Sequence, residues 1–201
     1  MSSAARLVQL TFGLVMAVLP WYGSVARSDV RATGKGGLGS RVNGKHGGKC
    51  SSGTCLITGG TDAGKNRFHR FRSFDTRGAI KGVKFKTGGK NNLVVGVTSP
   101  VGTYLDKLVS LSAPANLFWL SPGGIHLGSG AGFINVPQLN LSTATSLRFS
   151  DGVFDVYGSS AQQLQALTAD PLPGALGLID DPSQRADRGL PANPRILLEG
   201  I

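Results

Sequence analysis

The sequence predicts an all-β fold, a solenoid in which short strands stack turn upon turn. Short segments rich in β-branched and aromatic residues recur along the chain, and Gly, Pro, Asn or Asp residues bound each of them. One stretch, Ala115 to Gly128, shows the unit most clearly, since an apolar run meets a Ser-Pro-Gly-Gly corner and then resumes. Little of the chain has the spacing of an amphipathic helix. Repeated corners between short strands are typical of a solenoid.

The length and the first residues indicate one exported domain. The chain has 201 residues, of which 40% are hydrophobic, enough for one domain with a real core. Residues 1–26 are predicted to be an export signal, because Arg6 precedes an apolar run from Leu7 to Leu19 and Ser24-Val25-Ala26 offers a small-x-small cleavage site. The run is shorter than the roughly 20 residues of a membrane-spanning helix. An uncleaved anchor is the alternative, and no transmembrane helix is expected after cleavage.

The formal net charge of +10 is concentrated near the front of the chain. Residues 27–90 carry 15 Lys or Arg against 3 Asp, whereas residues 91–201 carry 5 against 8 Asp or Glu. Such asymmetry usually marks contact with something anionic, such as lipid head groups, a polysaccharide, an acidic protein surface or nucleic acid. For an exported protein, anionic cell-surface ligands are the better expectation and nucleic acid is not expected.

Residues 27–55 are predicted to be a flexible basic leader, because glycines alternate with Lys, Arg and Ser and nothing there would nucleate a core. Order is expected to begin near Cys55. In an oxidising compartment Cys50 and Cys55 can close a small disulfide ring. A zinc site that adds His46 and His69 is a weaker alternative, because this spacing is not a standard ligand pattern; free thiols are the third. No metal or other cofactor is expected.

From residue 56 onward, strands and turns alternate. In Ala79 to Lys86, apolar residues alternate with lysines, which predicts a strand with one buried face and with Lys81, Lys84 and Lys86 only approximately in phase on the other. Leu93 to Val97 is a continuously apolar strand. Further strands are predicted at 104–111, 117–120, 125–127, 132–136, 139–143, 146–149, 153–157, 176–179 and 195–201. A short helix is expected within Ala161 to Thr168, and a loop at 180–194.

The corner inside Ala115 to Gly128 is predicted to be a type II turn. Pro122 would occupy the first central position with its φ already fixed, and Gly123 would supply the positive φ that the next position of a type II turn requires.

Two local patterns suggest other chemistry, and both favour a structural interpretation. The segment from Gly59 to Lys65 matches G-x-x-x-x-G-K, but the next residue, Asn66, stands where a phosphate loop needs Ser or Thr. A turn between strands is therefore predicted. In residues 68–74 three phenylalanines alternate with basic residues. They are expected to fill a core rather than stack on single-stranded nucleic acid. His69 has no neighbouring Asp, Ser or Cys that would make it a convincing catalytic base.

The order of these residues resembles a known family. The chain from about Ile57 to Phe154 resembles the N-terminal secretion domain of filamentous haemagglutinin-type exoproteins, the two-partner secretion family. The residues that carry the resemblance are Gly59-Gly60, Gly64, Asn66, Phe68-His69, Phe71, Phe74, Ala115-Asn116-Leu117-Phe118, Pro122, Gly124-Ile125, Gly128, Phe149, Asp151-Gly152 and Phe154. The family's Asn-Pro-Asn-Gly-Ile corner is here Ser121-Pro122-Gly123-Gly124-Ile125.

This resemblance implies a right-handed parallel β-helix, a single-stranded solenoid with an N-terminal β cap and extra-helical hairpins. It also implies a function without catalysis: the periplasmic modules of a dedicated outer-membrane β-barrel transporter of a Gram-negative cell bind the domain while it is unfolded or partly folded. The domain then seeds folding outside the cell, on a secreted or surface-bound protein of an adhesin-like kind. The residues that the resemblance assigns to recognition are Asn66, Phe68, His69, Phe71, Asn116, Leu117, Phe118, Pro122, Gly124 and Ile125.

On this interpretation, residues 56–158 form the secretion domain and residues 159–201 form an extension, partly loop, with a possible last rung. Two other function classes remain open. A β-helix can carry a polysaccharide-degrading enzyme, for which Asp151 and Asp155 are the only close acidic pair on predicted strands. The basic front of the chain also permits a nucleic-acid-binding protein.

Overall fold

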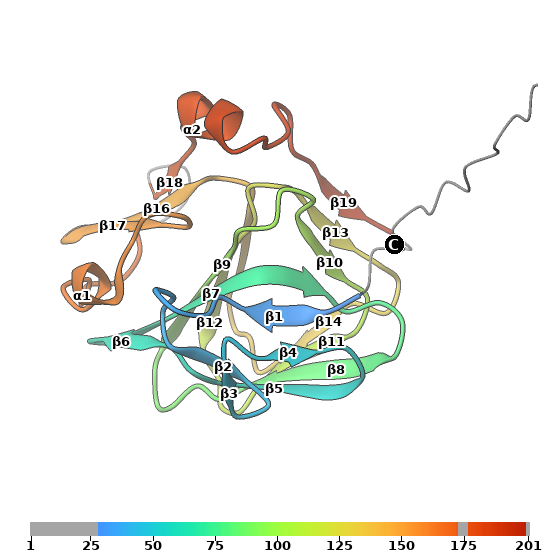
Figure 1. Ribbon diagram of the computed structural model, residues 1–201. Helices are drawn as coiled ribbons and strands as arrows, with labels where there is room; N and C mark the ends of the chain where they lie inside the picture. The colour runs from blue at the N-terminus through green and yellow to red at the C-terminus, as the bar shows by residue number, and fades with distance from the viewer. Residues whose placement is uncertain (1–27, 173–176, 200–201) are drawn as a thin grey trace, which may run out of the picture.

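The protein is a parallel β-solenoid of about three turns (Figure 1). The computed structural model describes residues 28–172 and 177–199, so the predicted export signal lies outside the described residues. Three stacks of parallel strands enclose a triangular core. The first stack contains β7 (Asn66–Asp75), β9 (Asn92–Val97), β12 (Asn116–Leu120) and β15 (Leu139–Ser142). No helix among the described residues is long and apolar enough to span a membrane.

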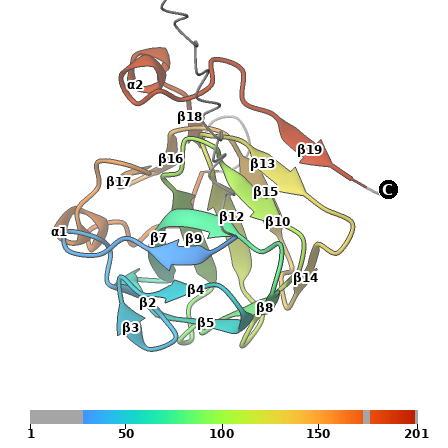
Figure 2. The same ribbon diagram turned by 45° about the vertical axis from the view of Figure 1, so that its right-hand side comes forward.

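The other two stacks complete the triangle. The second contains β5 (Gly53–Gly59), β8 (Ile80–Phe85), β11 (Leu108–Leu111) and β14 (Gly132–Ile134). The third contains the end of β7, β10 (Thr103–Leu105), β13 (Ile125–Leu127) and β19 (Ile196–Leu198). Figure 2 shows β19 beside β13. Each strand therefore lies against the strand one turn earlier, which is the arrangement that the repeated corners predicted.

The first turn is capped by antiparallel strands. β1 (Val30–Ala32) pairs with β7 and with β4 (Lys49–Cys50), whereas β2 (Ser40–Val42) pairs with β5 and with β3 (Lys45–His46). The expectation of a flexible leader over residues 27–55 is therefore wrong for the described part. Val30, Ala32, Val42 and Cys50 are buried in the core. These strands are only two or three residues long, so each supplies too little apolar periodicity to stand out against the Gly- and Lys-rich composition.

The chain leaves the solenoid twice. β6 (Thr61–Ala63) forms a hairpin with β7, so the phosphate-loop-like segment is a turn between strands, as predicted. After β15, a second excursion contains β16 (Ser146–Phe149), β17 (Gly152–Asp155), α1 (Ala161–Leu164), β18 (Leu178–Ile179) and α2 (Pro182–Asp187). The predicted loop at 180–194 thus contains a short helix, because Asp181 caps its N-terminus and Pro182 occupies its first turn.

Two hydrophobic clusters lie on the two faces of the first stack. Inside the triangle, Phe71, Phe74, Phe85 and Trp119 pack edge to face, with Phe74 and Trp119 centroids 4.6 Å apart. On the outside, the β16–β17 hairpin and α1 cover a second cluster that includes Phe68. Burial on both faces explains why β9 is continuously apolar rather than alternating.

Candidate functional site: the recognition segments and their corner

The fold brings the two predicted recognition segments to either side of one strand. β7 carries Asn66, Phe68, His69 and Phe71, and β12 carries Asn116, Leu117 and Phe118; both pair in parallel with β9. Phe68 and Phe118 lie opposite the same residue, Val94. Segments about 50 residues apart in the sequence are therefore two turns of one stack.

Nearly all of these side chains are buried in the folded protein. Phe68, His69, Phe71 and Leu117 are fully buried, and Phe118 is 8% exposed. Alternation along the strands sends Phe68 and Phe118 outward, under the β16–β17 hairpin, and Phe71 and Leu117 into the triangular core. The folded surface therefore does not present the predicted recognition residues as a patch that a partner could bind.

Asn66 and Asn116 belong to a ladder of stacked asparagines whose middle member is Asn92. Asn92 Nδ2 donates to Asn66 Oδ1 at 2.9 Å, and Asn116 Nδ2 donates to Asn92 Oδ1 at 3.0 Å. Asn66 Nδ2 donates in turn to the backbone oxygens of Leu167 and Ala169. The ladder joins three successive turns and fastens the second excursion to the first of them.

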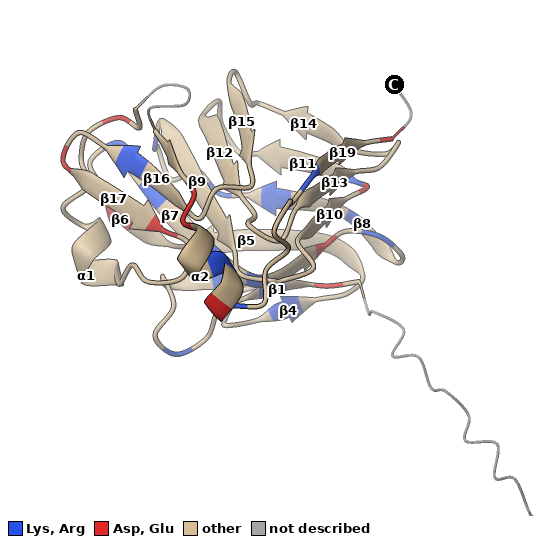
Figure 3. Ribbon diagram, turned by 90° about the horizontal axis from the view of Figure 1, so that it is seen from above, with Lys and Arg blue, Asp and Glu red and all other residues tan. Residues whose placement is uncertain are grey.

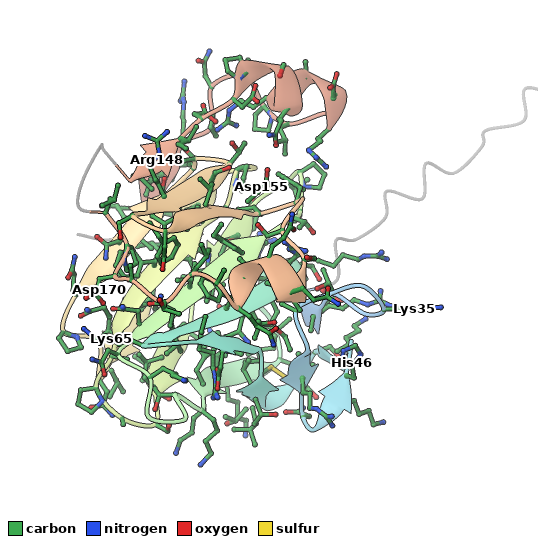
Figure 4. The ribbon with its side chains drawn as sticks, turned by 90° about the vertical axis from the view of Figure 1, so that its left-hand side faces the viewer. Lys35, His46, Lys65, Arg148, Asp155 and Asp170 are labelled. Carbon is green, nitrogen blue, oxygen red and sulfur yellow. A yellow bond between two sulfur atoms is a disulfide. The ribbon has the colours of Figure 1, made fainter. Side chains whose placement is uncertain are left out.

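Asp170 closes the ladder from outside. Its Oδ1 accepts a hydrogen bond from Asn92 Nδ2 at 2.9 Å, and its Oδ2 lies 3.3 Å from Lys65 Nζ. The hydrogen bond from Asn92, together with Lys65, holds the pKa of Asp170 below its usual value. Figure 4 shows Lys65 and Asp170 side by side at the edge of the stack. Neither Asn92 nor Asp170 was predicted; the spacing of 26 and 24 residues between Asn66, Asn92 and Asn116 is the sequence signal that would have found Asn92.

His69 is a neutral histidine inside the core. Its Nδ1 lies 3.0 Å from Ser40 Oγ, which itself accepts a hydrogen bond from the Arg70 backbone N–H. The ring packs against Phe71 and Phe85. Burial lowers the pKa of His69 to about 3, because the charged imidazolium would lose its hydration. His69 therefore acts as part of the cap–solenoid packing, in agreement with the structural role preferred from the sequence.

The Ser121–Gly124 corner is fixed by a chain of buried hydrogen bonds. Trp119 Nε1 donates to Thr103 Oγ1 at 3.2 Å, Thr103 Oγ1 donates to Ser121 Oγ at 3.0 Å, and Ser121 Oγ donates to the Gly124 carbonyl at 2.8 Å. The Gly124 N–H donates to the Ser121 carbonyl at 2.9 Å and closes the turn. The corner is thus tied to the tryptophan at the centre of the core.

The corner stacks directly on an equivalent one in the preceding turn, and this contact corrects the predicted turn type. Gly102 N–H donates to the Ser99 carbonyl just as Gly124 N–H donates to Ser121. Gly124, and not Gly123, has the positive φ, +113°, so the type II assignment is wrong. Gly123 is required for a different reason, since a Cβ there would lie 2.4 Å from the backbone nitrogen of Gly102.

A buried arginine covers the corner from the second excursion. Arg185, on α2, is 4% exposed, and its Nη1 donates to the Pro122 carbonyl at 2.9 Å. Its Nε lies 2.8 Å from both carboxylate oxygens of Asp180. The ion pair with Asp180 compensates for the burial of the guanidinium, and the hydrogen bond to Pro122 joins α2 to the predicted recognition segment.

The side chains considered as catalytic carboxylates or as zinc-binding cysteines form hydrogen bonds or a disulfide within the fold. Asp151 Oδ2 accepts hydrogen bonds from the backbone of Thr168 and Ala169, and Asp155 Oδ1 accepts them from Tyr157 and Gly158. Cys50 and Cys55 form a disulfide, so their thiolates are not available to a zinc ion. Within residues 28–172 and 177–199, no group of three or more His, Cys, Asp or Glu side chains is placed to hold a metal.

Comparisons with known proteins found no match: no family model, no curated protein and no solved structure matches the chain.

Removal of the middle of the asparagine ladder should destabilise the fold. We expect Asn92→Ala to lower the free energy of unfolding by about 2–4 kcal/mol, because it leaves the buried Asn66 Oδ1 and the partly buried Asn116 Nδ2 without their hydrogen bond to Asn92. Urea unfolding followed by circular dichroism measures the change. The exposed neighbour provides the control, and Asn91→Ala should change stability by no more than about 0.5 kcal/mol. Equal effects of the two substitutions would contradict the ladder.

The buried histidine should make the fold sensitive to acid. The pKa of His69 is about 3 in the folded protein and about 6.5 in the unfolded chain. The contribution of the neutral ring to the free energy of unfolding is therefore complete above pH 6.5, and it is lost as the pH falls and the unfolded chain takes up a proton. Between pH 7.5 and 5.0 the wild type should lose about 2 kcal/mol more stability than His69→Leu. Urea unfolding at both pH values measures this difference. The control substitution His46→Leu, at an exposed site, should lose as much stability between the two pH values as the wild type does. If His69→Leu also lost as much stability as the wild type, the assignment of His69 would be refuted.

Proposed function

We propose that this protein is an exported β-solenoid of the two-partner secretion type, recognised by a dedicated outer-membrane transporter before it folds. The observation that carries the proposal is the burial of both candidate recognition segments within one stack of the solenoid. A partner that reads Phe68, His69 or Phe118 has to meet the chain before these strands pair. This order of events is what the resemblance implies for a secretion domain, and it is consistent with the signal predicted at residues 1–26.

Recognition of an unfolded chain has a plausible physical form. An extended segment with alternating apolar side chains can add to the edge of a receptor sheet, where backbone hydrogen bonds provide affinity and pockets for alternate side chains provide specificity. On β12, Leu117 and Phe118 would then face opposite sides of the augmented sheet. When the chain emerges outside the cell, the pairing of β12 with β9 would replace its pairing with the receptor sheet.

The cap and the stacked turns support folding from the N-terminal end. Antiparallel strands cover the first turn, and each later strand has the previous turn as its template. Among the described residues the outer edges of β14, β15 and β19 pair with no further strand, so the last turn has unpaired backbone groups that can accept another strand. An adhesin-like role at the cell surface, through anionic ligands, is part of this proposal.

Export assays with matched substitutions test the proposal. The chain is expressed with and without a two-partner transporter, and its release into the medium is measured by pulse labelling. We expect Phe118→Asp and Pro122→Leu to reduce transporter-dependent release at least about tenfold, since each removes an apolar or turn feature of the recognition segment.

The control separates recognition from folding. Phe154 packs against Phe68 in the same outer cluster, with centroids 5.6 Å apart, but lies outside the recognition segments. Phe154→Asp should therefore impair the folded state and yet preserve release. Release that does not depend on the transporter, or normal release of Phe118→Asp, would refute the proposal; equal loss in Phe154→Asp would show that folding rather than recognition limits export.

A further inference from the structure

One whole sheet of the solenoid contains no acidic residue. It is the six-stranded sheet in the order β14-β11-β8-β5-β2-β3, which forms the lower side of the triangle in Figure 1. None of its strands contains Asp or Glu. Its inner face is part of the triangular core, since Cys55, Ile57, Val83, Phe85 and Val109 belong to that cluster. Its outer face is exposed to solvent and basic.

A β-bulge places two lysines of β8 together on this outer face. In the pairing of β5 with β8, Gly53 lies opposite Ile80 but Thr54 lies opposite Gly82, so Lys81 is an extra residue in β8. Without the bulge, Lys81 and Lys84 would face opposite sides of the sheet, because their separation is odd. With it, Lys81 and Lys84 are both exposed while Gly82 and Val83 are buried. Bulges commonly re-aim a side chain at a functional surface.

Two further basic residues extend the row across the sheet. Lys86, exposed directly after β8, lies two residues beyond Lys84, about 7 Å along the strand. Arg41 on β2 faces outward opposite Thr58 on β5 and beside His46 on β3. Since neighbouring strands lie about 4.8 Å apart, Arg41 is roughly 10 Å from the β8 row. We call these residues the basic face: Arg41, His46, Lys81, Lys84 and Lys86.

The charges of the basic face are not neutralised, whereas several cations elsewhere are. Arg67 pairs with Asp62, Arg77 with Asp75 and Lys65 with Asp170. No described carboxylate forms an ion pair with any member of the basic face. Figure 3 shows a basic segment on β8 and acidic segments around β6 and α2. The basic face therefore carries several positive charges that no described carboxylate neutralises.

We propose that the basic face binds a linear acidic polysaccharide, whose sulfate or carboxylate groups would lie along the row of β8 lysines and reach Arg41. Such a ligand matches cations repeated several ångströms apart on a flat surface. Nucleic acid fits less well, because the outward positions of the sheet include Thr54, Leu56, Thr58 and Ser110 but no Phe, Tyr or Trp on which bases could stack.

This inference goes beyond the proposed export role, since it concerns the folded protein in the absence of any transporter. The sequence predicted an anionic ligand. This inference names the surface that would bind it, the basic face, and its chemical class, a linear acidic polysaccharide. Failure of transporter-dependent export would leave this inference intact, whereas failure of this inference would remove the anionic-ligand part of the proposed function and leave the export part intact.

Binding of the purified folded protein to defined polymers tests the inference. The probes are dextran sulfate, polygalacturonate, uncharged dextran and duplex DNA, measured by biolayer interferometry over a range of salt concentrations. We expect salt-sensitive binding to at least one of the two acidic polysaccharides and none to dextran. The triple variant Lys81→Gln, Lys84→Gln and Lys86→Gln should bind at least tenfold more weakly, and its slope of log affinity against log salt should be shallower by about two to three.

A matched control removes the same charge elsewhere. The triple variant Arg72→Gln, Arg148→Gln and Arg195→Gln changes three exposed residues outside the acid-free sheet and should weaken binding less than threefold. Melting temperatures of both variants verify folding. Equal weakening in the two variants, no binding to either acidic polysaccharide, or tighter binding to DNA than to both would overturn the inference.

Discussion

The parallel register of β7, β9 and β12 is the constraint on which the rest of the molecule depends. It aligns Asn66, Asn92 and Asn116 into a hydrogen-bonded ladder, and it places Val95 between His69 and Trp119. A shift by one residue would exchange the two faces, so that the asparagines would enter the core and Phe71 and Trp119 would leave it. The same alignment lets the Ser99–Gly102 corner stack on the Ser121–Gly124 corner, where the backbones come too close for any side chain at Gly123.

This constraint also gives the proposed function its order of events. The side chains that resemble a secretion signal are the ones that the register buries, and the β16–β17 hairpin and Arg185 then cover them from outside. A signal that disappears on folding can be read only on the unfolded chain, so recognition and folding would exclude each other. The basic face has the opposite property, because its lysines are brought together on one surface only when the sheet has formed.

Much of the architecture follows from the sequence because corners and short apolar runs are local signals. The strand–corner–strand unit, the apolar strand at 93–97 and the short helix after Ser160 are all in the structure. The resemblance implied an N-terminal cap, but the cap strands within residues 27–55 were missed because Val30, Val42 and Cys50 are single buried residues in a glycine-rich context and their partners are distant in sequence. The same is true of Asp170 and Arg185, whose roles come from contacts with Asn92 and Pro122. The phase of Lys81 was uncertain because a bulge depends on how β5 and β8 pair.

On the proposed function, the predicted recognition segments are accessible only before the solenoid forms. The most direct measurement is the affinity of a transporter's periplasmic modules for this chain in two states: freshly diluted from denaturant, and fully folded. The account predicts binding to the diluted chain that disappears with the same time course as the gain of β-sheet signal, and no binding to the folded protein. Equal affinity for the folded protein would contradict it.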